Sequence, residues 1–514
     1  MILDVAAKRA ELTPDAPALL WRGRWLTYAE LNDRAERLAA ALREAGVEKG
    51  ERVAILAANH VAHIDLLLAT AKTGAVYAPL NVRLAEREQR ELAAYLRPAL
   101  VMHDEANADK ASATGLTAWH LDEHEDRLRA AAPAPRGGEP VVGPEDVQMI
   151  LLTGGTTGLP KGAMLPYRQG FYNAVNTVMS WQLRADDCVI QATPCYHAAL
   201  NAFTVPLFHL GGRVVLQPTF DPDEYLRLVA EAGATILFLV PTMYQMVASC
   251  ASFAGADLGG VRWAISGGAP CPEPVRAAFT RRGVPMRQGY GLTEAGVNCF
   301  ATTQEVADRK PHSVGKPMLH GEAVVRRPDG TPCEPNETGE LTLRGPHVFA
   351  GYFEREEATR EALRDGWLWT GDLAVVDDEG VFNIVGRRKE MFISGGENVY
   401  PAEVEAAIYD HDAVAECAVV GVPDERWGEV GLACVVLKPG RDLTADQLRE
   451  FLAPRLARYK VPKRIAFLAE LPKSGAGKVL KTRLAELAAP DASPGPEARP
   501  PGREGHARGT GGQA

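Results

Sequence analysis

The sequence predicts an α/β protein with a large N-terminal domain rich in parallel sheets and a small α+β C-terminal domain. Apolar strand-like runs alternate with helical periodicity through the first three quarters of the chain, which is typical of parallel sheets covered by helices. After Lys389, helices flank two strands in succession, the pattern of an α+β unit. The length of 514 residues also exceeds what one hydrophobic core usually supports, so more than one domain is expected.

We place the large domain at residues 1–388 and the small domain at residues 389–487. Residues 490–514 are rich in Pro, Gly, Ala and Arg and have no apolar periodicity, so they predict a disordered tail.

The first helix is expected from Thr27 to Ala45, where apolar residues recur at helical spacing after a threonine cap. Arg52 to Leu56 then predicts a strand. Shorter antiparallel strands near the domain edge are expected at Gly339–Leu343 and Val381–Val385. Other large-domain elements are expected at Ala75–Leu80, Arg213–Leu216 and Thr235–Val240 as strands, with a helix from Asp223. In the small domain we expect helices Pro401–Tyr409 and Ala445–Leu456 and strands Ala413–Val422 and Gly431–Lys438.

Composition narrows the classes of function. Hydrophobic residues make up 46% and charged residues 24% of the chain, as in ordinary soluble proteins, and the formal net charge is −10. This charge argues against a protein that binds nucleic acid by neutralising many phosphates. The stretch from Arg455 to Arg483 is nevertheless basic and suits the phosphates of a nucleotide, with a solvated helix face as the alternative.

The eight cysteines show no paired spacing for zinc or for a Cys-x-x-Cys motif, which predicts reduced, mostly buried thiols in a cytoplasmic chain. The N-terminus lacks the features of a signal peptide, and no apolar run is long enough to span a bilayer. A soluble cytoplasmic protein is therefore expected.

The most informative segment is the glycine-rich stretch at residues 151–162, directly after an apolar strand-like run. Its glycines let backbone N–H groups approach an anion, its threonines add hydroxyl donors, and its lysine adds a positive charge. The residues expected to hold phosphate are Thr153, Gly154, Gly155, Thr156, Thr157, Gly158 and Lys161. The spacing excludes a Walker A loop here and at Gly477-Lys478-Val479. A surface loop of turn-forming residues is the alternative.

This order of residues resembles the Thr-Ser-Gly-Thr-Thr-Gly-x-Pro-Lys-Gly signature of the adenylate-forming superfamily, which includes acyl-CoA synthetases, peptide-synthetase adenylation domains and firefly luciferase. Gly154 departs from it, since the family usually has a hydroxyl residue there. Five further segments match the family in the same order. They are Thr193–His197, Ile265–Pro270 with Gln288–Glu294, Trp367–Asp372, Gly386–Val399 and Leu471–Lys481.

The resemblance implies roles for residues in these segments. The nucleotide would be lined by Gly268, Ala269, Gln288, Gly289, Tyr290 and Gly291, with Tyr290 on the adenine, Thr293 on phosphate, Asp372 on ribose, and Arg387 on ribose or phosphate. Glu294 would hold Mg²⁺, with Thr156 as a second ligand, because a hard cation prefers oxygen ligands. The acyl pocket would include His197, Ala199, Leu200 and Asn201, and His197 and Glu294 would also be catalytic residues. A lone His is more often a core residue, which is the alternative for His197.

The remaining implied roles belong to the small domain. Ser394, Gly395, Gly396 and Glu397 would lie beside the pantetheine of CoA, and Lys389 would be the hinge. Lys478 would be the catalytic lysine, because a carboxylate that attacks the α-phosphate of ATP needs a cation to stabilise the charge of the transition state. A mobile basic tail is the alternative for Lys478.

The resemblance implies an ATP-dependent acyl-CoA synthetase that uses Mg²⁺ and CoA. It would form an acyl-adenylate and pyrophosphate, rotate about Lys389, and then transfer the acyl group to the CoA thiol. The apolar residues near the His197 segment favour a medium or long fatty acid, with a hydroxycinnamate or benzoate-type aryl acid as the alternative. An adenylation enzyme that loads a carrier protein, a luciferase-like oxygenase and a non-catalytic nucleotide-binding protein are further alternatives. A homodimer is a family-level expectation.

Overall fold

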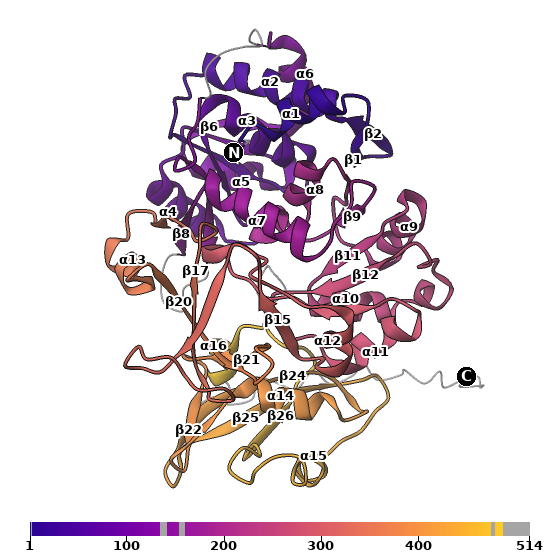
Figure 1. Cartoon of the computed structure of the whole chain (residues 1–514), viewed down its shortest axis with the longest axis vertical. Helices are drawn as coiled ribbons and strands as arrows, with labels where there is room; N and C mark the ends of the chain where they lie inside the picture. Colours follow the sequence, from indigo (N-terminus) through magenta and orange to yellow (C-terminus); the bar gives the residue numbers. More distant parts are fainter. Residues whose placement is uncertain (2, 134–140, 154–159, 474–478, 487–514) are drawn as a thin grey trace, which may run out of the picture.

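The computed structural model describes residues 1, 3–133, 141–153, 160–473 and 479–486. Within these residues the chain forms four β-sheets, three of them before Arg387 and one after it (Figure 1). The predicted boundary at residue 388 falls between the strand that ends at Arg387 and the one that begins at Phe392.

The first sheet has the strand order β18-β8-β7-β4-β3-β5-β6, and its pairs from β7 to β6 are parallel. Its strands are β3 (Arg52–Leu56), β4 (Val76–Pro79), β5 (Leu100–His103), β6 (Thr117–His120), β7 (Val147–Thr153), β8 (Lys161–Pro166) and β18 (Gly351–Tyr352). The accompanying helices are α1 (Val5–Leu12), α2 (Tyr28–Glu44), α3 (Val61–Thr73), α4 (Glu86–Leu96), α5 (Ala108–Ala113), α6 (His124–Ala130) and α7 (Tyr167–Ser180). The predicted Thr27 cap is confirmed, because Thr27 and Glu30 form a reciprocal capping box on α2.

The second sheet has the order β13-β12-β11-β9-β10-β1-β2, and all its pairs except β1 with β2 are parallel. Its strands are β1 (Pro17–Trp21), β2 (Arg24–Thr27), β9 (Cys188–Gln191), β10 (Arg213–Leu216), β11 (Ile236–Leu239), β12 (Trp263–Ser266) and β13 (Met286–Gln288). Its helices are α8 (Thr204–Leu210), α9 (Pro222–Ala232), α10 (Pro241–Ser249) and α11 (Glu273–Arg281). The predicted dominance of parallel α/β sheets is therefore confirmed.

The third sheet is antiparallel, and it is larger than the two short edge strands that the sequence predicts. Its strands are β14 (Phe300–Ala301), β15 (Ser313–Pro317), β16 (Glu322–Arg326), β17 (Gly339–Arg344), β19 (Leu363–Arg364), β20 (Trp367–Val376) and β21 (Phe382–Arg387). The helices α12 (Gln304–Arg309) and α13 (Glu356–Ala362) lie within the same stretch of the chain. Pairing between distant strands completes this sheet, so local sequence patterns show only part of it.

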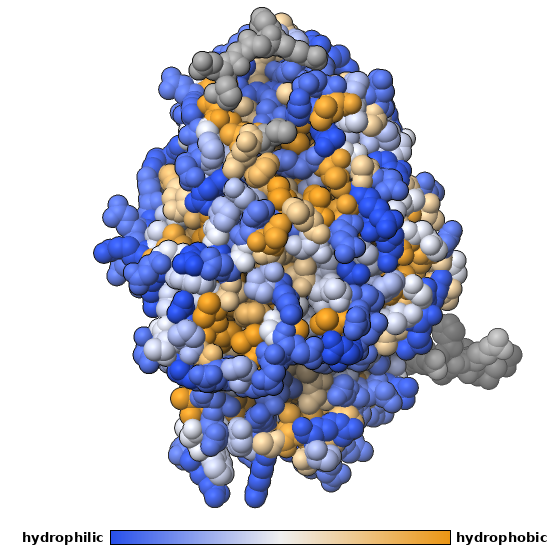
Figure 2. All heavy atoms as spheres, in the orientation of Figure 1, coloured by the Kyte–Doolittle hydropathy of each residue, from blue (hydrophilic) through white to orange (hydrophobic). Residues whose placement is uncertain are grey.

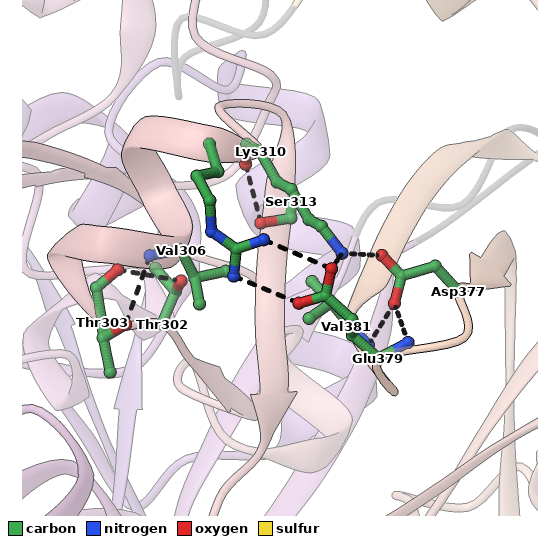
Figure 3. Close-up of polar contacts among 9 residues, drawn as sticks. Thr302, Thr303, Val306, Lys310, Ser313, Asp377, Glu379 and Val381 are labelled. Atoms are coloured by element: carbon green, nitrogen blue, oxygen red, sulfur yellow. Dashed lines mark hydrogen bonds and ion pairs between the residues drawn. The ribbon is translucent and has the colours of Figure 1, made fainter.

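An ion-pair network fixes the turn between β20 and β21 to α12 (Figure 3). The guanidinium of Arg309 donates two hydrogen bonds to Glu379, at 3.2 and 3.1 Å, and the Lys310 ammonium lies 2.8 Å from the same carboxylate. Asp377 pairs with Lys310 and accepts the Val381 backbone N–H at 3.0 Å. The turn of the β20–β21 hairpin is thereby held against α12, within the large domain.

In the described residues the small domain packs three helices with a five-stranded sheet and has its own core. Its strands are β22 (Phe392–Ser394), β23 (Glu397–Val399), β24 (Val414–Asp424), β25 (Gly428–Leu437) and β26 (Arg464–Phe467), and its helices are α14 (Pro401–Tyr409), α15 (Ala445–Leu452) and α16 (Lys481–Glu486). Helix α15 ends earlier than predicted, because Pro454 follows Ala453 and has no backbone N–H to continue the helical hydrogen bonds.

All eight cysteines are free and five of them are buried, as predicted. Among the described helices, none is long and apolar enough to cross a bilayer. On the face shown in Figure 2, hydrophilic residues predominate and apolar side chains gather only in small groups between them. The predicted tail at residues 490–514 lies outside the described residues.

Candidate active site

Two neighbouring parallel strands bring the predicted adenine segments to one edge of the second sheet. Ser266 at the end of β12 lies opposite Gln288 at the end of β13, so the turns after both strands leave the sheet together. The Gln288 amide donates to Ser266 O at 3.2 Å and Ala269 O at 3.1 Å, and it accepts the Cys271 N–H at 3.0 Å. Gly268 takes a φ of +83° in this turn. Gln288, predicted to line the nucleotide, thus also shapes the turn that carries Gly268 and Ala269.

The glycines before Glu294 have a packing reason of their own. A Cβ at Gly291 would lie 2.2 Å from the carbonyl carbon of Val297, and one at Gly289 would lie 2.8 Å from Cδ1 of Ile265. Any side chain at these positions would therefore push the following turn out of place. Contact between Gly289 or Gly291 and a nucleotide stays a prediction.

Asp372, Tyr290 and Arg387, which lie far apart in sequence, meet at one point. Asp372 and Arg387 are opposite each other on β20 and β21, with 2.8 Å between Arg387 Nε and Asp372 Oδ1. The Tyr290 hydroxyl donates to Asp372 Oδ2 at 2.6 Å. Burial and, second, the Asp372 charge raise the pKa of Tyr290 well above its usual range, so the phenol stays a donor. The buried Asp372 carboxylate is therefore oriented on both oxygens, which suits the predicted ribose contact.

Tyr352 connects the predicted magnesium ligand Glu294 with Lys161, the lysine of the predicted phosphate loop. Glu294 is part of the short 3₁₀ helix Thr293–Ala295, and its Oε1 accepts the Tyr352 hydroxyl at 2.8 Å. The Lys161 ammonium lies 4.9 Å from the centre of the Tyr352 ring, a cation–π contact. Burial and then Glu294 raise the pKa of Tyr352, so its proton remains on the phenol. A half-buried carboxylate held in this way fits one ligand position of a hard cation.

The two ends of the phosphate loop are adjacent. Thr153 ends β7 and Lys161 begins β8, and the two residues are paired in the antiparallel ladder. The Thr153 hydroxyl donates to Lys161 O at 3.3 Å. The other predicted phosphate contacts, Gly154, Gly155, Thr156, Thr157 and Gly158, lie outside the described residues.

The His197 segment is held from both sides by buried side chains. The Asn59 amide donates to Thr193 O at 3.1 Å and accepts the Cys195 N–H at 2.8 Å, and the Tyr77 hydroxyl donates to Cys195 O at 3.2 Å. The half-buried His197 ring packs on that of Tyr196, with 4.6 Å between centroids. The 3₁₀ helix Ala198–Asn201 follows, in which Ala199 is half-buried, whereas Leu200 and Asn201 are buried.

The predicted CoA segment forms the β22–β23 hairpin at the lower end of the molecule in Figure 1. Gly395 and Gly396 take φ values of +63° and +89° at its tip, and both are exposed, as is Glu397, whereas Ser394 is buried. A Cβ at Gly395 would lie 2.8 Å from the ring of Trp427, so that ring covers the tip closely.

The face of the small domain that carries the ends of the Lys478 segment is turned toward the large domain. The Gln245 side chain on α10 donates to Ala415 O at 2.9 Å, and the adjacent Glu416 pairs with Lys473 at 2.7 Å. On the other side of the segment, Lys481 pairs with Glu390, the residue after the predicted hinge Lys389, at 3.0 Å. Lys478 itself lies outside the described residues.

Comparison with known proteins agrees with this arrangement. The family described as AMP-binding enzyme matches residues 6–353, and the AMP-binding enzyme C-terminal domain matches residues 403–478. The chain belongs to the AMP-binding enzyme family. It is 41% identical to a feruloyl-CoA synthase of Amycolatopsis sp, covering 92% of this chain and 96% of that protein. It is 38% identical to an indoleacetate–CoA ligase of Aromatoleum aromaticum, covering 94% and 97%.

A solved structure shares the fold of this AMP-binding enzyme. The o-succinylbenzoate CoA synthetase of Bacillus subtilis with its acyl-adenylate has a TM-score of 0.85, 31% identity, and coverage of 94% of this chain and 97% of that one. Another structure of that synthetase contains ATP and a magnesium ion. The predicted fold of a large α/β domain with a small C-terminal domain is confirmed, and the chain is an AMP-forming acid–CoA ligase.

Sequence reasoning missed three residues that orient the candidate site of this ligase, namely Asn59, Tyr77 and Tyr352. Each of them acts on a segment that is distant in sequence, and none stands in a glycine-rich or charged motif. A local pattern therefore offers no signal for them.

Proposed function

We propose that this ligase activates an aryl acid and transfers it to CoA. The observation that carries the proposal is that the feruloyl and indoleacetate ligases, similar over nearly their whole length, are both named for acids with an aromatic ring. This replaces the fatty acid that the sequence favours and adopts the aryl acid that it offers as the alternative.

The surroundings of the predicted acid site are compatible with a flat ring. A Cβ at Gly267 would lie 3.4 Å from Cε2 of Phe238, so glycine leaves a gap beside that ring. Behind it, Phe203 contacts both Phe238 and Trp263, with centroid distances of 5.4 and 5.7 Å. Phe203 and Trp263 are buried and Phe238 is half-buried, so Phe238 is the ring on which a planar substrate would pack.

In the first step, a carboxylate oxygen of the acid attacks the α-phosphorus of ATP, and the bond to pyrophosphate breaks. Arg387 and Lys478 would stabilise the charge on the phosphate, and Asp372 would hold the ribose. Glu294 would hold Mg²⁺, which when bound neutralises charge on the phosphates.

In the second step, the CoA sulfur attacks the acyl carbon, the bond to AMP breaks, and the thiol proton goes to solvent. The Gly395-Gly396 tip would line the path of the pantetheine. In this structure the tip lies at the far end of the small domain, so the predicted rotation about Lys389 would bring it to the acyl-adenylate.

The test is a pyrophosphate-release assay with Mg-ATP over matched panels of hydroxycinnamates, benzoates, arylacetates and fatty acids, with and without CoA. Release with aryl acids, raised by CoA and accompanied by a thioester, is the expected result. Faster turnover of fatty acids would contradict the aryl assignment, and release that CoA does not raise would indicate loading of a carrier protein.

A further inference from the structure

Helix α7 buries a polar stripe where an apolar face is usual. Gln169, Asn173 and Thr177 recur every four residues on one side of the helix, with exposures of 2, 2 and 0%. Buried amides and hydroxyls are costly unless each is hydrogen-bonded, so such a stripe needs specific partners.

The partners are the two turns that carry His197 and Glu294. Asn173 Nδ2 donates to Asn201 O at 2.7 Å, in the turn after His197. Asn173 Oδ1 accepts the Asn298 N–H at 3.4 Å, in the turn after Glu294. The buried Asn173 amide therefore bridges both turns. It donates to the turn after His197 and accepts from the turn after Glu294.

Neighbouring contacts make this bridge rigid. Asn298 Nδ2 donates to Ala202 O at 2.8 Å and to Thr177 Oγ1 at 3.0 Å, which closes a ring of bonds around the bridge. A Cβ at Gly296 would lie 2.8 Å from Asn173 Oδ1, so the amide is packed directly on the second turn. Gln169 donates to Thr293 O at 3.0 Å and secures the start of the same turn.

We infer that Asn173 is a positioning residue that sets the spacing between the two turns and thereby the fit of the acid. The inference rests on the proposed function, because it takes the turn that carries His197 as a wall of the acid site and the turn that carries Glu294 as part of the predicted phosphate and Mg²⁺ site. Asn173 acts through the backbone of these turns and does not itself touch the substrate. The predicted nucleotide contacts at Asp372 and Arg387 lie on the third sheet, whereas Thr293 and Glu294 lie on one of the bridged turns, so changing Asn173 should alter acid binding more than ATP binding.

The experiment compares Asn173→Ala with Asn176→Ala. Asn176 is on the same helix, is 1% exposed, and accepts the His320 N–H at 2.9 Å, so its loss removes one buried bond that does not reach either turn. KM for the best aryl acid, KM for ATP and kcat are measured by pyrophosphate release, and thermal melting is recorded for both variants.

For Asn173→Ala we expect the acid KM to rise about tenfold and the ATP KM to rise clearly less, and for Asn176→Ala we expect neither to change. Asn173→Asp keeps the size of the side chain but places an acceptor against the Asn201 carbonyl, so its acid KM should rise at least as much. Equal kinetics of the two alanine variants would overturn the inference, as would a parallel rise of the acid and ATP KM.

If Asn173→Ala does not fold, Asn298→Ala is read in the same way, because it removes the second tie between the turns and leaves Asn173 in place. The substrate panel of the parent enzyme tests the proposed substrate class separately from the role of Asn173. If it turns over fatty but not aryl acids, the proposed substrate class fails, and the Asn173 comparison is then made with the acid that it does use.

Discussion

The predicted ribose site around Asp372 in the large domain and the predicted CoA hairpin around Gly395 in the small domain differ in burial and in hydrogen bonding. Around the nucleotide side, Asp372 is buried and held on both oxygens by Tyr290 and Arg387. At the hairpin, Gly395 and Gly396 are exposed, and Ile393 is 48% exposed.

This difference suggests how one chain serves two half-reactions. Bonds between distant segments preorganise Asp372, the predicted ribose ligand, before any substrate binds. The hairpin presents backbone and apolar surface that can become part of a site only against another surface. Variants around Asp372 should therefore affect adenylate formation, and variants of the Gly395 hairpin should affect thioester formation.

The largest effect is expected for Lys478→Ala, whose role rests on the family resemblance. Removing the cation should lower acyl-adenylate formation by about 10²–10³-fold, because the charge of the transition state loses its partner. Thioester formation from added acyl-adenylate should persist. The two half-reactions are assayed separately, with Lys438→Ala, at an exposed lysine of the same domain, as the control. Equal loss of both half-reactions would contradict a role of Lys478 in adenylate formation alone.

Asp372→Asn should come next. The change leaves Arg387 without its anion and weakens the predicted ribose contact, so adenylate formation should fall about a hundredfold, mainly through the ATP KM. Pyrophosphate exchange measures this, with Asp377→Asn at the opposite end of the same hairpin as the control. An unchanged ATP KM would count against the ribose role.

Tyr352→Phe tests how Glu294 is held. Loss of the 2.8 Å hydrogen bond frees the carboxylate, so the Mg²⁺ concentration that gives half-maximal adenylate formation should rise about tenfold. Tyr28→Phe, which removes a buried 2.7 Å bond to Gly212 O, is the control for general destabilisation. A normal Mg²⁺ dependence in Tyr352→Phe would separate Tyr352 from the metal.

Gly395→Ala tests the hairpin. Its φ of +63° is strained for alanine, and the new methyl group would lie 2.8 Å from the Trp427 ring. Thioester formation should therefore slow about fivefold, with a raised CoA KM and normal adenylate formation. Gly440→Ala, at a φ of +72° with open space around the Cβ, carries the same strain elsewhere in the domain. If both variants behave alike, the hairpin has no special role.

The smallest effect is expected for Glu379→Gln in the turn of the β20–β21 hairpin. Hydrogen bonds from Arg309 and then Lys310 lower the pKa of Glu379 from 4.5 to about 2. The contribution of the Glu379 ion pairs to the free energy of unfolding is therefore present above the unfolded pKa of Glu379 and is lost as the pH falls toward 2. Solvent exposure of the pairs keeps this contribution small. The Tm of the parent should exceed that of the variant at about pH 6, and the gap should narrow at about pH 3. A gap independent of pH would exclude the ion pairs as its source.

Local patterns predicted the regular elements well where one segment carries the whole signal. Strand Arg213–Leu216 and helix Pro401–Tyr409 have the bounds that the sequence predicts, because apolar periodicity and a proline at the helix start are local features. The antiparallel sheet was underestimated, because β15 pairs with β21 and β17 pairs with β20 across long stretches of chain.

The sequence by itself determined the family of this ligase and the identity of its charged groups, since glycine-rich turns, Lys161, Glu294, Asp372 and Arg387 stand in recognisable local motifs. Only the tertiary structure decided how these groups are oriented. Asn59, Tyr77, Asn173 and Tyr352 act through hydrogen bonds to segments far away in sequence. Such bonds form only after sheets and helices have packed, so they leave no periodicity or spacing that a linear reading can detect.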